Sequence, residues 1–138
     1  MSLIESYVVE EDGFHPVLVR DSWQVAKLNY KDEYHINNLN RLRIHQKTDR
    51  AFALLSGNAV LIAIDNDDKK TSFKVVLMQR GTSYNIPKNV GYTIVMEEGS
   101  KVFTVERPNT HIDDVKYYPL DEEQLITIRL NVNEEYKK

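Results

Sequence analysis

Cysteine is absent from this 138-residue chain, and basic residues are not in excess. The lack of cysteine excludes disulfide frameworks, thiolate catalysis and cysteine-ligated zinc. The 18 Lys and Arg residues are outnumbered by 21 Asp and Glu residues, which gives a formal net charge of −3. Nucleic-acid binding draws on a basic surface field, so we do not expect a nucleic acid as a partner.

Long apolar runs are absent too. No segment approaches the roughly 18 consecutive apolar residues that a membrane-spanning helix needs, so no contact with a membrane is expected. Residues 1–12 lack the basic flank and the apolar run of a signal peptide. We therefore expect a cytoplasmic protein, and a chain without cysteine is compatible with that reducing compartment.

Signatures of common catalytic and ion-binding loops are also missing. The chain contains neither the G-x-S-x-G nucleophile elbow nor the G-x-G-x-x-G dinucleotide loop. The acidic turn at residues 65–70 (D-N-D-D-K-K) resembles the start of a calcium loop. An EF-hand needs an oxygen ligand at the fifth position and glycine at the sixth, where Lys69 and Lys70 stand. We expect a solvated hairpin turn there instead.

Short apolar segments, by contrast, recur every eight to twelve residues through most of the chain, separated by turn-forming clusters such as 56–58 and 107–109. This spacing predicts one all-β domain over residues 1–138, built as a sandwich or a closed barrel. Trp23 is expected as a large core or interface anchor. The expected strands are 17–19, 23–28, 42–45, 51–55, 59–64, 73–78, 92–96 and 101–106.

Histidines outside these strands are interpreted as structural. His35 lies in the polar, asparagine-rich segment 30–40, which we expect as a loop or a sheet edge. His111 stands near Asp113 and Asp114, in a group that resembles a metal cluster. No second histidine follows at ligand spacing, so a polar loop is expected there.

The C-terminal residues 121–132 carry two conflicting patterns. Asp121 is followed three residues later by Gln124, which is a capping-box start for a helix. The apolar residues from 126 to 132 alternate as they would in a strand. A short helix is the preferred interpretation, and a strand is the alternative.

Two stretches carry more specific motifs. Residues 43–57 read R-I-H-Q-K-T-D-R-A-F-A-L-L-S-G, and residues 81–92 read G-T-S-Y-N-I-P-K-N-V-G-Y. Together they resemble the two paired motifs of the cupin family, with the second extending to about residue 96. The resemblance implies a cupin-like jelly-roll β-barrel over roughly residues 15–125. It also implies a homodimer in which N-terminal strands pack across the interface, and exposed sheet edges favour such pairing.

The residues that shape the scaffold of these motifs are kept. Gly57 stands at the closing glycine of the first motif, and Gly81 and Pro87 match the second. Glycine and proline shape tight turns because they permit or impose unusual φ values. Two positions depart from the pattern, since Leu39 stands at the leading glycine of the first motif and Asn89 at a glycine of the second.

The positions that bind a metal in the family are mostly changed. His45 aligns with the first histidine, Lys47 with the second, Arg50 with the glutamate and Tyr92 with the histidine of the second motif. Arginine has no lone pair to offer, and lysine and tyrosine bind a metal only after losing a proton. We therefore expect no tightly bound metal and no other cofactor.

If the barrel closes as in the family, these four residues converge near its mouth, because alternate residues of a strand share a face. A pocket lined by His45, Lys47, Arg50 and Tyr92 is cationic and suits a small ligand such as a carboxylate, phosphate or acidic sugar. In the competing interpretation Lys47 and Arg50 point to solvent or pair with carboxylates, and residues such as Phe52 fill the barrel.

Two hypotheses about function follow from this pocket. In the first, the chain is a metal-free cupin that binds a small molecule or acts as an accessory protein. In the second it is an enzyme, either an isomerase or epimerase of sugars with His45 and Tyr92 as acid and base, or a metal enzyme whose ligands include positions such as His35. The first hypothesis is preferred, because the metal-binding positions are changed.

Overall fold

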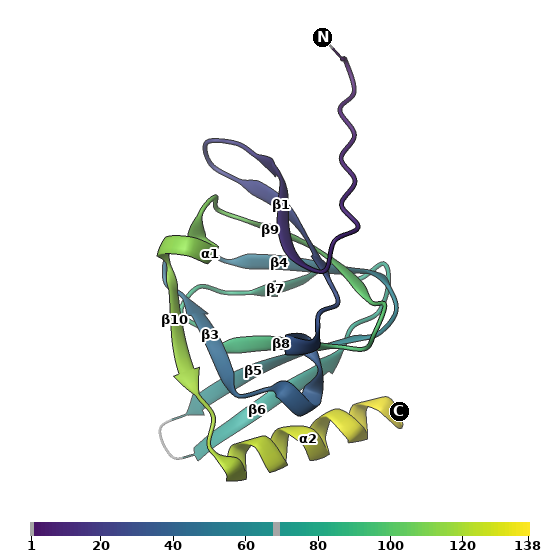
Figure 1. The fold of residues 1–138 in the computed structure, drawn as a ribbon. Helices are drawn as coiled ribbons and strands as arrows, with labels where there is room; N and C mark the ends of the chain where they lie inside the picture. Colours follow the sequence, from purple (N-terminus) through teal and green to yellow (C-terminus); the bar gives the residue numbers. More distant parts are fainter. Residues whose placement is uncertain (1, 68–69) are drawn as a thin grey trace.

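Two antiparallel sheets form the body of the protein (Figure 1). The computed structural model describes residues 2–67 and 70–138. The five-stranded sheets have the orders β1-β2-β9-β4-β7 and β10-β3-β8-β5-β6. The strands and helices are β1 Gly13–Val19, β2 Gln24–Asn29, η1 Asp32–Tyr34, η2 Ile36–Asn38, β3 Arg41–His45, β4 Arg50–Ser56, β5 Ala59–Asp67, β6 Lys70–Leu77, β7 Tyr84–Ile86, β8 Tyr92–Met96, β9 Lys101–Glu106, α1 Thr110–Asp113, β10 Val115–Pro119 and α2 Glu122–Tyr136.

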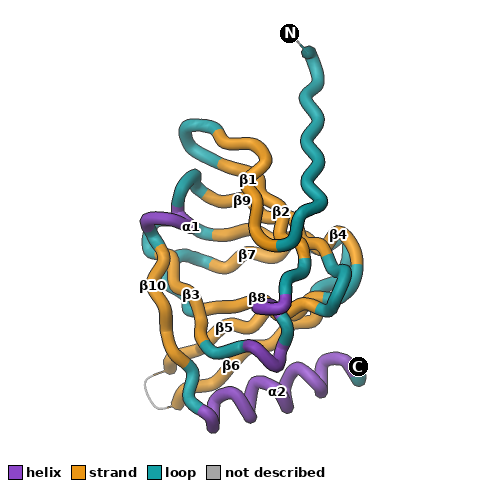
Figure 2. Tube along the Cα trace, viewed as in Figure 1, coloured by secondary structure: helices purple, strands orange, loops and turns teal. Residues whose placement is uncertain are grey.

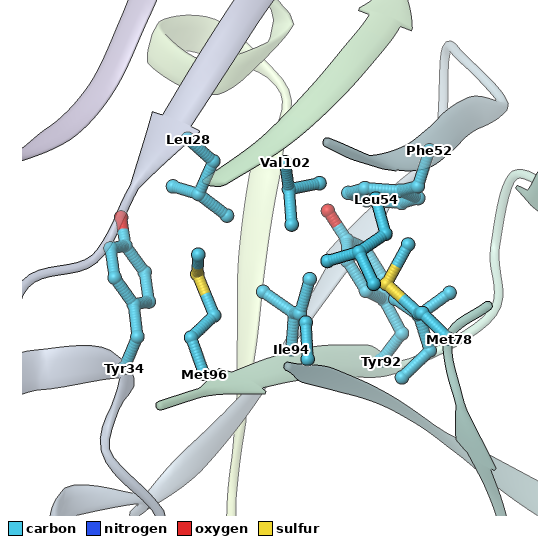
Figure 3. Packing of buried hydrophobic residues seen from close by; sticks show 11 residues of the cluster. Leu28, Tyr34, Phe52, Leu54, Met78, Tyr92, Ile94, Met96 and Val102 are labelled. Carbon is cyan, nitrogen blue, oxygen red and sulfur yellow. The ribbon is translucent and has the colours of Figure 1, made fainter. Parts of the chain in front are cut away.

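The inner core lies between the two sheets and follows strand alternation. Phe52 and Leu54 of β4 are buried, as is Val102 of β9, whereas the residues between them are more exposed. They pack against Ile94 and Met96 of β8 (Figure 3). On the same inward face, each of these three strands also carries a charged or polar residue: Arg50 in β4, Tyr92 in β8 and Glu106 in β9. These residues form part of the site described below.

Helix α2 covers the outer face of the second sheet (Figure 2). Its capping box is formed, since the Asp121 side chain accepts from the Gln124 N–H at 2.8 Å and the Gln124 side chain accepts from the Asp121 N–H at 3.0 Å. Ile128 and Val132 are buried against the sheet, four residues apart on one helical face. The helix is therefore confirmed, and the apparent strand alternation came from a second pair on the exposed face, Ile126 and Leu130.

The motif turns explain which scaffold residues the sequence keeps. Gly57 has φ +80°, and a Cβ on it would lie 2.8 Å from the Ser100 Cα, so a side chain does not fit there. Asn89, which replaces a motif glycine, has φ 71°. Asparagine tolerates the left-handed region better than most residues, so this departure keeps the same turn.

Two positions differ from what the sequence suggested. Trp23 was expected as a core or interface anchor, and it does not lie in the core, because it is 42% exposed and precedes β2, whose inward positions start with the fully buried Gln24. A place for Trp23 in an interface stays a prediction. The segment around His111 contains the four-residue helix α1 where a loop was expected.

The acidic hairpin is described only in part. Strands β5 and β6 pair up to Asp67 and Lys70. Residues 68–69 of the proposed solvated turn lie outside the described residues. Within residues 2–67 and 70–138, no helix is long and apolar enough to cross a membrane.

Candidate functional site

A cavity of about 400 Å³ opens between the two sheets. That volume lies within the range of small-molecule sites. Its walls include the apolar residues Leu28, Phe52 and Ile94 and three further aromatic residues. Those three are Phe14 of β1, Tyr34 of η1 and Tyr117 of β10. Polar and charged residues complete the lining, among them His15, Lys31 and Arg43. The cavity therefore combines aromatic and apolar walls with charged groups, and both decide what it can bind.

Three of the four residues predicted for the site line this cavity. His45 from β3, Arg50 from β4 and Tyr92 from β8 converge there. Lys47 does not, because it is exposed and lines a separate open depression beside Trp23. Strand β3 ends at His45, and the next two backbone N–H groups turn to donate to the Asp114 carboxylate at 3.0 and 2.8 Å. Lys47 therefore no longer follows the alternation of β3. The prediction that it lines the pocket is wrong.

Arg50 is held inside the barrel by two side chains. Its Nη2 donates to Glu106 Oε1 at 3.1 Å, and its Nη1 donates to the Tyr92 hydroxyl oxygen at 2.7 Å. The Glu106 side chain is 0% exposed, and its Oε1 also accepts from Gln24 Nε2 at 2.9 Å. The positive charge of Arg50 is thus largely neutralised by Glu106, which the sequence prediction did not include.

His45 lines the cavity as a neutral ring with one unprotonated nitrogen. The ring is buried, and its Nδ1 lies 3.1 Å from the backbone carbonyl oxygen of Asp114. A carbonyl oxygen only accepts, so Nδ1 carries the hydrogen and Nε2 does not. Burial and the nearby Arg50 charge lower the pKa of His45 to about 4, so the ring is neutral at pH 7. Among the described residues, Nε2 has no hydrogen-bond partner.

Tyr92 presents a proton to the same space. Burial raises the pKa of its phenol above the usual value of 10, although Arg50 acts in the opposite direction. The group is therefore a neutral phenol at pH 7. Its oxygen accepts from Arg50, which leaves the hydroxyl proton free to be donated. The ring packs in the inner core beside Phe52, with centroids 5.8 Å apart (Figure 3).

Other buried polar atoms around the cavity also lack partners within residues 2–67 and 70–138. They are Arg50 Nε, Thr104 Oγ1 and His111 Nδ1. An unpaired buried polar group costs about 1–3 kcal/mol, so a polar partner for each of these atoms would stabilise the protein. Strand alternation in β9 could have identified Thr104 and Glu106, because both are polar residues at inward positions that continue from the buried Val102.

These residues do not fit a metal ion of the kind that cupins bind. The described part of the chain contains no group of three or more His, Asp or Glu side chains placed to hold one. His45 is the one good ligand among the four motif positions, and the Arg50 guanidinium beside Tyr92 would repel a divalent cation. The absence of a bound metal in solution stays a prediction.

The alternative ligands considered from the sequence have other roles. His35 Nδ1 accepts from the Asn37 N–H at 3.1 Å, which caps the short helix η2, and the residue does not line the cavity. The Asp114 carboxylate accepts from the backbone of residues 46 and 47. A metal enzyme with ligands at His35 or in the His111 group therefore has no support in this geometry.

Comparisons with known proteins show the fold of the chain. No family model and no curated protein matches the sequence. A cupin family protein of Methanocaldococcus jannaschii with a double-stranded β-helix fold is 12% identical, with 78% of this chain and 94% of that one covered and a TM-score of 0.50. A Bacillus halodurans protein is 13% identical, with 72% of each chain covered and a TM-score of 0.52.

A third match is an enzyme. Hydroquinone 1,2-dioxygenase from a Sphingomonas species, solved with 4-hydroxybenzoate bound, has a TM-score of 0.54. It is 7% identical, with 78% of this chain and 80% of the dioxygenase covered. At such identities the three matches carry information about the fold and none about activity.

Proposed function

Since this chain has the cupin double-stranded β-helix fold, as its paired motifs predicted, we propose that it is a metal-free cupin that binds a small molecule between its sheets. One observation carries the proposal. The buried His45 Nε2 and Arg50 Nε lack partners among the described residues, and both residues line the cavity between the sheets. A ligand that supplies those partners gains hydrogen bonds in a site of low dielectric.

The charge distribution supports a ligand with at most one negative charge. Arg50 is already paired with Glu106, so a polyanion such as a phosphate finds little uncompensated charge. Arg43 at the wall of the cavity forms a long ion pair with Glu33, at 3.9 Å. Burial is the main cause that lowers the pKa of His45, and both arginines add to it whereas Asp114 opposes it. A single carboxylate or an electron-rich oxygen best suits the partly compensated charge of the two arginines.

The walls support a ligand with a ring. Phe14, Tyr34, Phe52 and Tyr92 all contribute aromatic surface, and aromatic side chains favour ring ligands through offset and edge contacts. The Sphingomonas dioxygenase holds a small aromatic acid in the same fold, although that ligand belongs to the dioxygenase. We therefore place small aromatic or cyclic acids and alcohols first among the candidates.

Filling the cavity should abolish binding without disturbing the surface. We expect a Thr104→Met variant to bind at least tenfold more weakly than wild type, because the longer side chain enters the cavity beside the buried Thr104 position. The measurement is ligand-observed NMR with a library of small acids, alcohols and cyclic compounds. Thr127→Met, at an exposed position of α2, is the matched control and should bind as wild type does. Equal binding by both variants would place the ligand elsewhere.

An acid–base enzyme is the second candidate, because His45 and Tyr92 line one cavity with ring centroids 6.0 Å apart. The pKa directions favour binding over catalysis. A histidine with a pKa of about 4 is a weak base, and a phenol with a raised pKa is a weak acid. Incorporation of solvent deuterium at carbon of a bound compound, lost in Tyr92→Phe, would favour the enzyme.

We also propose that two copies of the chain associate through the N-terminal segment. Residues 2–8 extend away from the sheets (Figure 1), and Leu3, Ile4 and Val8 are 77–98% exposed. Covering exposed apolar side chains with a partner lowers the free energy, because their surface is removed from water. We expect sedimentation to give the mass of two chains, and the mass of one chain after deletion of residues 2–8. A single-chain mass for the full-length protein would contradict this proposal.

A further inference from the structure

The hydrogen-bond polarity of the cavity restricts the chemistry of its ligand. His45 Nδ1–H is committed to the Asp114 carbonyl oxygen at 3.1 Å, so Nε2 can only accept. The residue is 3% exposed, and Nε2 has no partner in the described part of the chain. A ligand group that only accepts would leave two lone pairs facing each other. This end of the ligand must therefore carry a donor.

The opposite polarity is found at Tyr92 and Arg50. The Tyr92 oxygen already accepts from Arg50 Nη1 at 2.7 Å, so the hydroxyl proton points away from the guanidinium and can be donated. Arg50 Nε is a second donor without a partner among residues that the structure describes. Two donors from residues that line the same cavity require an acceptor oxygen on the ligand.

We propose that the cavity selects small hydroxy acids and hydroxy ketones, whose hydroxyl donates to His45 Nε2 while the carboxylate or carbonyl oxygen accepts from Tyr92 Oη and Arg50 Nε. This inference rests on the small-molecule function proposed above and names its ligand class. Nothing in it requires a metal or a proton transfer.

The dimensions allow one compact molecule to reach both ends. The His45 and Tyr92 rings lie 6.0 Å apart between centroids and both residues line the same cavity, so one small molecule in it can contact both of them. The ring centroid of Phe14 lies 5.2 Å from the Arg50 guanidinium carbon and 4.9 Å from the ring centroid of His111. Phe14 therefore provides an apolar wall beside both residues in the cavity. Water can donate to His45 and accept from Tyr92 as well, so a ligand gains most when one rigid molecule supplies both groups.

Matched pairs of compounds test the donor directly. The probes are 3-hydroxybenzoate, 4-hydroxybenzoate and mandelate, each compared with its own methyl ether, which keeps the acceptor and loses the donor. We expect at least one hydroxy compound to bind at least tenfold more tightly than its ether by calorimetry or NMR titration. A site built to bond a hydroxyl rejects analogues that lack it, because its own polar atom is then left unpaired.

Two variants assign the two ends of the ligand. His45→Phe should bring the hydroxy compound and its ether within about threefold of each other, because the acceptor is gone. Tyr92→Phe should weaken both members of the pair by a similar factor and leave their ratio unchanged. Tyr136→Phe, on α2 away from the cavity, is the control and should match wild type.

A spectroscopic readout on wild-type protein covers the case in which His45→Phe does not fold. The imidazole ¹⁵N spectrum should show the His45 Nε2 signal moving toward the protonated range when the hydroxy compound binds and staying in place with the ether. Equal binding of both members of every pair would overturn the inference, as would a preference that survives in His45→Phe. Binding of other library compounds but of no hydroxy compound would also overturn it, while leaving the small-molecule function intact. If no library compound binds at all, the small-molecule function itself fails.

Discussion

Replacing Arg50 with methionine is expected to destabilise the protein by about 3–5 kcal/mol, because the buried Glu106 carboxylate loses its counter-charge. The Glu106 side chain is 0% exposed, and one of its oxygens accepts from both Arg50 and Gln24. The other oxygen has no partner within the described residues. Urea unfolding of wild type and Arg50→Met measures the difference in the free energy of unfolding.

Two controls separate this pair from arginine pairs in general. Arg20 pairs with Glu5 at 3.4 Å, but their side chains are 49% and 53% exposed, so Arg20→Met should cost at most about 1 kcal/mol. Adding Glu106→Gln to Arg50→Met removes the unpaired charge and still leaves an acceptor for Gln24. That double variant should recover at least half of the lost stability. A loss below about 1 kcal/mol in Arg50→Met alone would mean that Glu106 takes up a proton or reaches solvent.

Acidification should weaken the fold through His45. Burial and the Arg50 charge lower its pKa from 6.5 to about 4, so between these values the unfolded chain binds a proton that the folded protein excludes. Stability is therefore complete above pH 6.5 and declines as the pH falls toward 4. The full effect is roughly 3 kcal/mol, because each tenfold difference in proton affinity is worth about 1.4 kcal/mol.

A variant that lacks the His45 imidazole separates the contribution of His45 to the pH dependence of stability from that of other titrating groups. The free energy of unfolding is measured at pH 7.5 and pH 4.5 for wild type and for His45→Gln. We expect wild type to lose about 2–3 kcal/mol more than His45→Gln over this interval. Parallel losses in the two proteins would show that His45 is protonated in the folded state at pH 4.5.

Much of the fold could be predicted because its signals are local. Apolar residues at alternate positions identify β4 and β9, and the turn residues Gly57 and Pro87 identify the motif turns. The unsuitability of Arg50 as a metal ligand could also be read from the sequence, since the lack of a lone pair is a property of the residue type. Helix α2 was harder to predict. Its buried and exposed pairs, each four residues apart, imitate the alternation of a strand until a sheet is present to bury one pair.

The site could be predicted only in part. The two motifs pointed to His45, Arg50 and Tyr92, and these residues do line one cavity. Lys47 was misplaced, because the extension of strand alternation past His45 ignored the turn that Asp114 stabilises from far along the chain. Glu106 and Thr104 were not predicted as site residues, although they occupy alternate positions of β9 on the same face as the apolar Val102.

The sequence alone determined the all-β class, the paired turns and the presence of a cation where the cupin motif has a glutamate, since each depends on residue type or on short-range periodicity. The tertiary structure alone decided what surrounds that cation. Arg50 and Glu106 are 56 residues apart in the sequence and meet because β4 pairs with β9. Asp114 reaches His45 because β10 pairs with β3. The polarity of the cavity therefore depends on strand order, which no local pattern in the chain encodes.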